Sequence, residues 1–129
     1  MIDFHLDVRS GVAPYVQLVQ QVRHALRLGL LSVGDQLPTV KEVVSKLAIN
    51  PNTVLKAYRE LEHEGLVSPR PGIGTFVTRS LADSSLAAHE PLRQALLQWL
   101  ADAYKAGLDA ESIEALFMTT FRASVGASK

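Results

Sequence analysis

Apolar residues recur at helical spacing in two short, neighbouring segments of the chain. In residues 51–63 they fall at positions i, i+3, i+4 and i+7, namely Val54, Ala57, Tyr58 and Leu61. In residues 40–47 they are Val43, Val44 and Leu47. Because such a stripe buries one face of a helix against a core, the pattern predicts two short amphipathic helices that follow one another closely.

Helix-capping residues precede both segments. Thr39 and Glu42 have the spacing of a capping box, in which the hydroxyl accepts a hydrogen bond from the new helix and the carboxylate accepts one from the amide of the cap residue. Asn50 is a favoured N-cap, and Pro51 suits the first position of a helix. The signals therefore predict one helix directly after Thr39 and a second directly after Asn50.

Strand-forming residues flank a turn after the second helix. Gly65 ends that helix, and residues 66–68 and 75–78 surround the turn-forming run Pro69-Arg70-Pro71-Gly72-Ile73-Gly74. We interpret this arrangement as a β-hairpin, with residues 36–37 adding a short strand beside it. Two short helices followed by a hairpin predict an α+β fold of the winged helix-turn-helix type, in which the hairpin is the wing.

The remaining segments indicate two parts of the chain. Residues 1–13 are expected to form an extended arm, and Pro14 opens a further helix that completes a three-helix core. Residues 80–85 have the small, polar composition of a linker. We therefore predict a winged helix-turn-helix domain at residues 1–79 and a separate C-terminal region at residues 80–129.

Two helices are predicted in the C-terminal region. The first runs from about residue 86 to residue 106, and the second begins at Asp109, with the chain fraying from Ser124. Their apolar residues form a wide stripe: Leu92, Leu96, Trp99, Ala103, Ile113, Phe117 and Phe121. Because two helices are too few to close a ligand pocket of about 300 Å³ or more, we expect this stripe to be a homodimer interface.

Residues 14–77 carry a series of short motifs in a fixed order. They are Pro14-Tyr15, Gly34-Asp35-Gln36-Leu37-Pro38, Thr53-Val54, Glu60-Leu61-Glu62, Glu64-Gly65-Leu66 and Gly72-x-Gly74-Thr75-Phe76-Val77. Their order and spacing resemble the DNA-binding domain of GntR-type bacterial transcription regulators. With a short helical tail, the chain resembles the YtrA-type subgroup more narrowly on the runs Asn50-Pro51-Asn52-Thr53-Val54 and Ala57-Tyr58.

The resemblance implies a sequence-specific regulator of transcription. It is expected to bind an inverted-repeat operator in double-stranded DNA as a homodimer and to act as a repressor, and the subgroup further implies control of a transporter operon. In a helix-turn-helix the second helix enters the major groove. The residues expected to contact DNA are Thr39, Lys41, Asn50, Asn52, Thr53, Lys56, Arg59, Arg70, Gly72 and Gly74.

Several positions differ from the family pattern or allow more than one contact. Pro51 and Leu55 stand where the family often has arginine, and Lys41 is a point charge rather than a bidentate fork. Lys56 and Arg59 can each reach a guanine or a phosphate. Leu55 either contacts thymine methyl groups or is an exposed leucine without a role.

Composition excludes several classes of function. The 129-residue chain contains no cysteine, which excludes disulfides and thiolate metal sites, and its 4 histidines lack metal-ligand spacing. No nucleophile and base occur in a catalytic pattern, so we expect no enzyme activity, metal or cofactor. With no signal segment and no apolar run long enough to span a membrane, the chain is expected to be cytoplasmic.

Charge permits a nucleic-acid partner without demonstrating one. The formal net charge is +0, but the charges are unevenly distributed. Residues 1–79 contain nine Lys and Arg and seven Asp and Glu, whereas residues 80–129 contain four Lys and Arg and six Asp and Glu. DNA binding needs a basic surface, and this asymmetry is mild. A winged helix that binds another protein and no DNA is therefore the alternative hypothesis. Whether a small-molecule effector binds at the dimer interface is left open.

Overall fold

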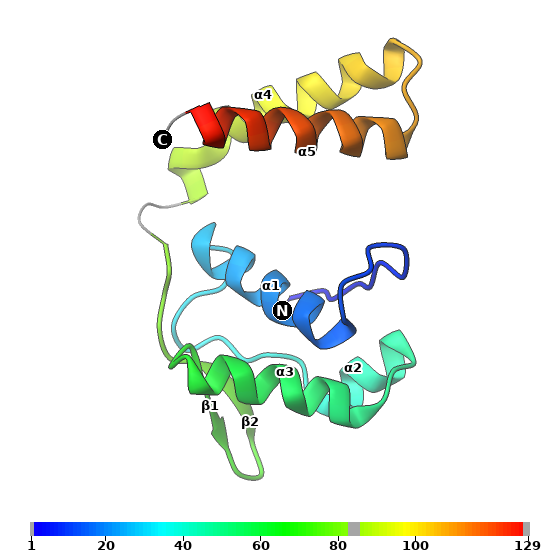
Figure 1. The fold of residues 1–129 in the computed structure, drawn as a ribbon. Helices are drawn as coiled ribbons and strands as arrows, with labels where there is room; N and C mark the ends of the chain where they lie inside the picture. Colours follow the sequence, from blue (N-terminus) through cyan, green and yellow to red (C-terminus); the bar gives the residue numbers. More distant parts are fainter. Residues whose placement is uncertain (1, 83–85, 128–129) are drawn as a thin grey trace. The chain divides into compact units, whose positions relative to one another are not determined.

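The computed structural model describes residues 2–82 and 86–127, in two compact units, Met1–Ala88 and His89–Lys129. Residues 83–85 of the predicted linker and residues 128–129 of the predicted frayed end lie outside the described residues. The chain contains α1 (Pro14–Arg27), α2 (Val40–Leu47), α3 (Pro51–His63), β1 (Val67–Arg70), β2 (Gly74–Val77), α4 (Leu86–Lys105) and α5 (Ala110–Ala127) (Figure 1). This element order confirms the predicted α+β winged helix-turn-helix.

Capping side chains determine where α2 and α3 begin. The amide of Glu42 donates to Oγ1 of Thr39, and the amide of Thr39 donates to Oε1 of Glu42, each over 3.1 Å. The amide of Asn52 donates to Oδ1 of Asn50 over 2.8 Å. Both predicted helix starts are therefore confirmed. Ala48, directly after α2, takes a left-handed conformation with φ 54°, which turns the chain toward α3.

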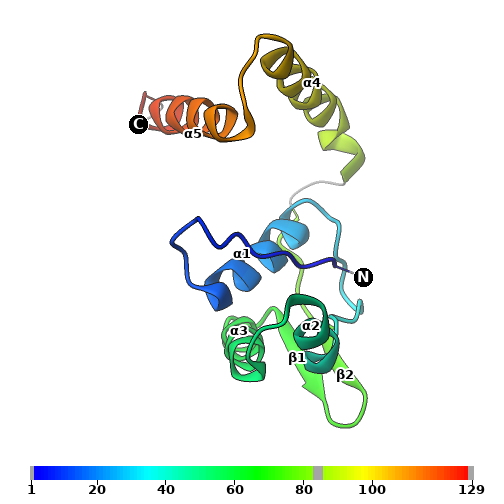
Figure 2. The same ribbon diagram turned by 90° about the vertical axis from the view of Figure 1, so that its right-hand side faces the viewer.

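Three helices enclose the core of the first unit. Both α1 and α2 pack against α3, and Figures 1 and 2 show α1 next to α3. The most deeply buried side chains are Leu18, Leu26, Leu37, Leu61, Val22, Val54 and Val77. The buried hydroxyl of Tyr58 donates to the carbonyl oxygen of Pro38 over 2.5 Å. Burial, with a smaller effect from the Glu42 carboxylate, raises the pKa of Tyr58 above its ordinary value.

The wing is an antiparallel hairpin of β1 and β2. Val67 lies opposite Val77 at its base. The predicted strand at residues 36–37 is reduced to an isolated bridge between Gln36 and Phe76. The amide of Leu37 donates to the carbonyl oxygen of Thr75, and the next amide of the same orientation, that of Thr39, donates to Glu42 instead, so the pairing ends there.

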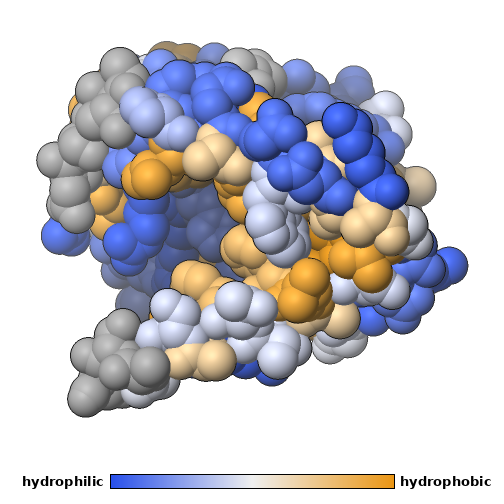
Figure 3. Space-filling view, turned by 90° about the horizontal axis from the view of Figure 1, so that it is seen from above, coloured by the Kyte–Doolittle hydropathy of each residue, from blue (hydrophilic) through white to orange (hydrophobic). Residues whose placement is uncertain are grey.

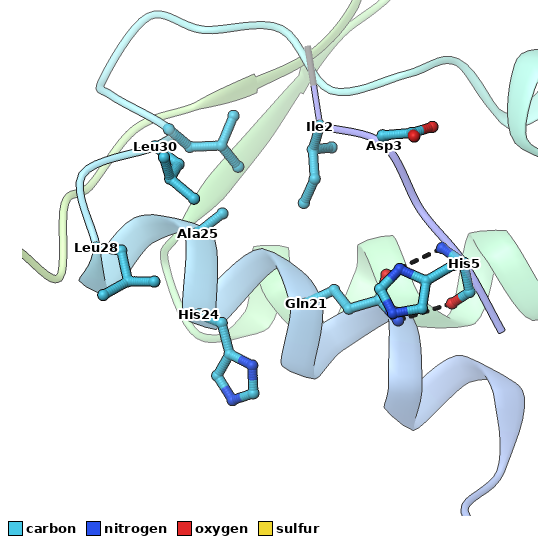
Figure 4. Close-up of a pocket in the computed structure, with 9 residues that line it drawn as sticks. Ile2, Asp3, His5, Gln21, His24, Ala25, Leu28 and Leu30 are labelled. Carbon is cyan, nitrogen blue, oxygen red and sulfur yellow. Dashed lines mark hydrogen bonds between the residues drawn. The ribbon is translucent and has the colours of Figure 1, made fainter. Parts of the chain in front are cut away.

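The N-terminal arm before α1 is fastened to two helices. The amide of His5 donates to Oε1 of Gln21 over 3.1 Å, and Nε2 of Gln21 donates to the carbonyl oxygen of His5 over 2.7 Å (Figure 4). Asp3 forms an ion pair with Lys46 of α2. A hollow of about 500 Å³ lies between the arm and the end of α1. The arm therefore connects α1 to the first helix of the helix-turn-helix.

The second unit is a hairpin of α4 and α5. Oδ1 of Asp109 accepts a hydrogen bond from the amide of Ser112 over 2.8 Å and so caps α5, and the contact with Ser112 lowers the pKa of the Asp109 carboxyl. Figure 3 shows a hollow between the two helices, closed at their turn and flanked by apolar side chains. The rings of Trp99 and Phe117 lie 6.3 Å apart between centroids, so the helices meet through large side chains.

The predicted fraying from Ser124 is wrong for the described residues, because α5 continues to Ala127. No helix breaker separates Phe121 from Val125, and Val125 repeats the apolar face of the helix one turn later. The apolar surface of α5 is therefore longer than the sequence pattern predicted.

Candidate DNA-binding interface

The face of α3 opposite its buried stripe is polar and basic. Asn52, Lys56 and Arg59 are exposed there, at i, i+4 and i+7. Thr53 and Leu55 are half-buried at the edges of this outer face. The structure thus brings Asn52, Lys56 and Arg59 onto one convex surface, as their spacing predicted.

The carboxylates of α3 lie at its other end. Glu60 and Glu62 are exposed in the last turns of the helix. Glu64, just beyond the helix, pairs with Arg23 of α1, whose Nε donates to Oε2 of Glu64 over 3.2 Å. The charge of α3 therefore changes sign along its length. An anionic partner is favoured at the first half, where the helix dipole is also positive.

A shallow, open groove of about 410 Å³ lies between the N-cap of α2 and the wing. It is lined by Thr39, Pro69, Arg70, Pro71, Gly72, Ile73, Gly74 and Thr75. Four of the predicted contact residues, from two separate segments, therefore meet in one place. Lys41 is exposed in the first turn of α2, and Asn50 is exposed at the start of α3 although its side-chain oxygen caps that helix.

The side chain of Gln36 holds the wing loop, a role that the sequence did not predict. Its Nε2 donates to the carbonyl oxygen of Ile73 over 3.2 Å. Gly74 has φ +148°, and a Cβ atom built on it would collide with the Gln36 amide. Gly74 therefore permits a close approach within the protein, a role separate from its predicted contact with DNA. The only sequence signal for this clamp is the position of Gln36 in the Gly34–Pro38 motif.

Aromatic rings hold two of the predicted DNA-binding cations. Nζ of Lys56 lies 4.0 Å from the centroid of the Tyr15 ring, and the guanidinium carbon of Arg70 lies 4.4 Å from that of Phe76. At these distances the negative face of a ring attracts the cation. Both aromatic residues belong to motifs that carry the family resemblance. Their contacts with the cations were not predicted, because Tyr15 and Lys56 are distant in sequence and Arg70 and Phe76 lie on different strands.

The residues predicted to form the dimer interface divide by exposure. Leu92, Leu96, Phe117 and Phe121 are exposed, and Trp99 is half-buried. Ala103 and Ile113 are buried, with exposed fractions of 7% and 5%, and they lie close to the turn that joins α4 to α5. Those two residues therefore pack within a single chain. Additional exposed apolar side chains lie on the same helices, namely Leu97, Tyr104, Leu116, Met118 and Val125.

Within residues 2–82 and 86–127, no group of three or more His, Asp or Glu side chains is arranged to hold a metal ion. None of the helices described is long and apolar enough to cross a membrane.

Comparison with known proteins identifies the family. The family described as bacterial regulatory proteins, gntR family, matches residues 14–77. The HTH-type transcriptional repressor YtrA of Bacillus subtilis (strain 168) is 34% identical over 109 residues, which cover 84% of each chain. The chain belongs to the gntR family. It is accordingly a DNA-binding transcriptional regulator, and its similarity to YtrA confirms the narrower resemblance as well.

A second curated relative and two solved structures support this assignment to the gntR family. The regulator Rv1152 of Mycobacterium tuberculosis is 40% identical over 84 residues, covering 64% of this chain and 69% of that protein. A transcriptional antiterminator from Listeria monocytogenes aligns with TM-score 0.58 and 30% identity over 92% of this chain and 90% of its own. YtrA from Sulfolobus acidocaldarius aligns with TM-score 0.54 and 29% identity over 75% of this chain and 96% of its own.

Proposed function

We propose that this gntR-family regulator binds an inverted-repeat operator in double-stranded DNA as a homodimer and represses transcription there. The observation that carries the proposal is the outer face of α3, where Asn52, Lys56 and Arg59 project away from the core. A helix with such a face, placed after a tight turn, enters the major groove with its first residues at the base edges.

The groove between α2 and the wing suits a DNA backbone. Thr39 lies at its α2 side, and Arg70 and Gly72 lie at its wing side. Phosphate oxygens are bound by arginine, by hydroxyl groups and by backbone amides. Thr39 and Arg70 are therefore proposed as phosphate contacts, with Lys41 beside them, while Asn52, Thr53 and Arg59 of α3 are proposed to meet base edges.

The second unit supplies the proposed dimer interface. Leu92 is 72% exposed and Phe121 is 54% exposed, and both lie on apolar faces of the open α4 and α5 hairpin. Large contiguous apolar surfaces on a protein usually mark interaction sites. A second copy of the chain is the proposed occupant, because a two-fold dimer presents two identical recognition helices and an inverted repeat presents two identical half-sites.

The proposed sign of regulation and the proposed targets rest on relatedness. The B. subtilis relative is named a transcriptional repressor, and we propose repression here for that reason. Control of a transporter operon is proposed from the resemblance to the YtrA-type subgroup. The regulator is proposed to act in the cytoplasm, where the bacterial chromosome lies.

Selection of fragments from a pool of random duplexes by the purified chain tests the proposal. We expect enrichment of two inverted half-sites separated by about one helical turn, 10–10.5 base pairs, or a multiple of it. A matched Phe121→Glu chain should enrich single half-sites weakly. Enrichment of a single, non-repeated site by the unchanged protein would contradict the homodimer.

A winged helix that binds only another protein is the competing function. Retention on heparin separates the two, because a phosphate-binding surface gives a steep dependence on salt whereas a protein-interaction surface does not. We expect retention that falls steeply with salt and that weakens further in an Arg70→Ala chain.

A further inference from the structure

We infer that Lys56 is an anchor for the DNA backbone rather than a base reader, and that the ring of Tyr15 positions it for that role. The inference rests on the proposed operator binding. It decides between the two contacts, with guanine or with phosphate, that the sequence allows for this lysine.

Tyr15 and Lys56 come from different helices. Tyr15 is in the first turn of α1, half-buried, and packed against the core of the first unit. Its ring is therefore fixed by the same contacts that hold α1 against α3. Nζ of Lys56, an exposed residue of α3, lies 4.0 Å from the centroid of that ring. A fixed ring thus holds the end of an otherwise mobile side chain.

The position of the ring determines where the ammonium lies. Asn52, Lys56 and Arg59 leave α3 in the same outward direction, which points at base edges when the helix is in the major groove. The contact with Tyr15 instead draws Nζ of Lys56 toward α1, at the flank of α3. The walls of the major groove beside a recognition helix are the two phosphate backbones, so an ammonium at this flank meets phosphate.

The wing carries the same type of contact. Arg70 lies over the ring of Phe76, so a ring of α1 holds one cation of α3 and a ring of the wing holds a cation of the wing itself. Figure 1 shows α1 and the wing on different sides of α3. Because the Tyr15 ring holds Lys56, the residues Asn52, Thr53 and Arg59 remain as the α3 side chains free to reach the bases.

Binding to two duplexes separates the two roles of Lys56. Fluorescence anisotropy is measured with the selected operator and with a scrambled duplex of equal length, at several salt concentrations. Lys56→Ala should weaken both complexes by the same factor and lower the salt slope by about one. Arg27→Ala, which removes an exposed cation at the far end of α1, is the control for charge alone and should change neither complex by that factor. A loss confined to the operator would overturn the inference by making Lys56 a base reader.

Variants of the ring test the positioning role. Tyr15→Leu should weaken both duplexes roughly two- to fivefold, the worth of an exposed cation–π contact, while Tyr15→Phe, which keeps the ring face, should retain the affinity of the unchanged protein. In a Lys56→Ala background, Tyr15→Leu should have no further effect on DNA affinity. Thermal unfolding of each variant shows whether α1 is still packed.

The outcomes keep this inference separate from the proposed function. Failure of the unchanged protein to bind any duplex would remove the operator function itself. Two results would overturn only the role of Tyr15. One is unchanged operator affinity in Tyr15→Leu, and the other is a loss of affinity from Tyr15→Leu that is as large in the Lys56→Ala background as in the unchanged protein. If Tyr15→Leu does not fold, the comparison of the two duplexes with Lys56→Ala still decides between phosphate and base.

Discussion

Tyr58 of α3 donates its hydroxyl hydrogen to the carbonyl oxygen of Pro38 over 2.5 Å, and this bond ties α3 to the residue just before the cap of α2. The contact is buried, so water cannot donate a hydrogen bond to the Pro38 oxygen in place of the Tyr58 hydroxyl. The relative position of the two helices of the helix-turn-helix therefore depends on one side-chain contact in addition to apolar packing.

Removal of that hydroxyl should destabilise the first unit. Tyr58→Phe keeps the ring but leaves the buried carbonyl oxygen of Pro38 without its donor, and we expect the free energy of unfolding to fall by about 1–2 kcal/mol. Urea denaturation followed by circular dichroism measures the change. Tyr15→Phe removes a hydroxyl from a half-buried ring and is the matched control. A stability equal to that of the unchanged protein would show that the bond is not a net stabilising contact.

The same tyrosine predicts how stability depends on alkaline pH. Burial raises the pKa of Tyr58 in the folded protein, whereas in the unfolded chain the phenol ionises near its ordinary value of about 10. The unfolded state therefore loses protons first, and stability should be unaffected below about pH 10 and fall as the pH rises above it. Unfolding free energies at pH 8–11 should show a smaller decline in Tyr58→Phe. An equal decline in both proteins would assign the effect to other groups.

The left-handed residue between α2 and α3 offers a stabilising substitution. Ala48 has φ 54° and ψ 43°, a conformation that disfavours every residue with a Cβ atom. Ala48→Gly should raise the free energy of unfolding by about 0.5–1 kcal/mol, after allowance for the greater freedom of glycine in the unfolded chain. Ala48→Val should lower it. A destabilised Ala48→Gly protein would mean that this turn has a different backbone conformation.

Two glycines of the wing should respond differently to alanine. At Gly74 a new Cβ atom would meet the amide of Gln36 at φ +148°, whereas at Gly72, with φ +77°, it would meet nothing within 4 Å. Gly72→Ala should therefore cost only the backbone strain, about 1–2 kcal/mol, and Gly74→Ala should cost more. Operator affinity and thermal unfolding measure both effects. Gln36→Ala should relieve part of the Gly74→Ala defect, and no relief would exclude the close approach.

Local capping signals in the sequence predicted the helix-turn-helix, but the sequence did not predict the side-chain contacts between separate elements. The capping box of Thr39 and Glu42 and the Asn50 cap lie within a few residues of the helices that they start, so sequence alone located both starts. The contacts of Tyr15 with Lys56 and of Gln36 with Ile73 join separate elements, and no local spacing encodes them.

The sequence pattern could not predict which apolar residues of the C-terminal hairpin are buried. Ala103 and Ile113 share the apolar pattern of Leu92 and Phe121, yet they are buried beside the turn while the other two are exposed. The pattern identifies apolar positions, but the angle between α4 and α5 determines which of them a single chain can cover. That angle depends on the large side chains between the helices, including Trp99 and Phe117.

Homodimeric binding to an inverted repeat is tested most directly by the affinity and stoichiometry of the intact chain on matched duplexes that carry either one half-site or the full repeat. At one physiological salt concentration, we expect two chains on the full repeat with a Kd of about 10⁻⁸ M or tighter, and a Kd of about 10⁻⁴–10⁻⁶ M for the single half-site. The Phe121→Glu chain should bind the full repeat as weakly as the half-site. One chain per full repeat, or equal affinity of the intact chain for both duplexes, would contradict a homodimer that reads an inverted repeat.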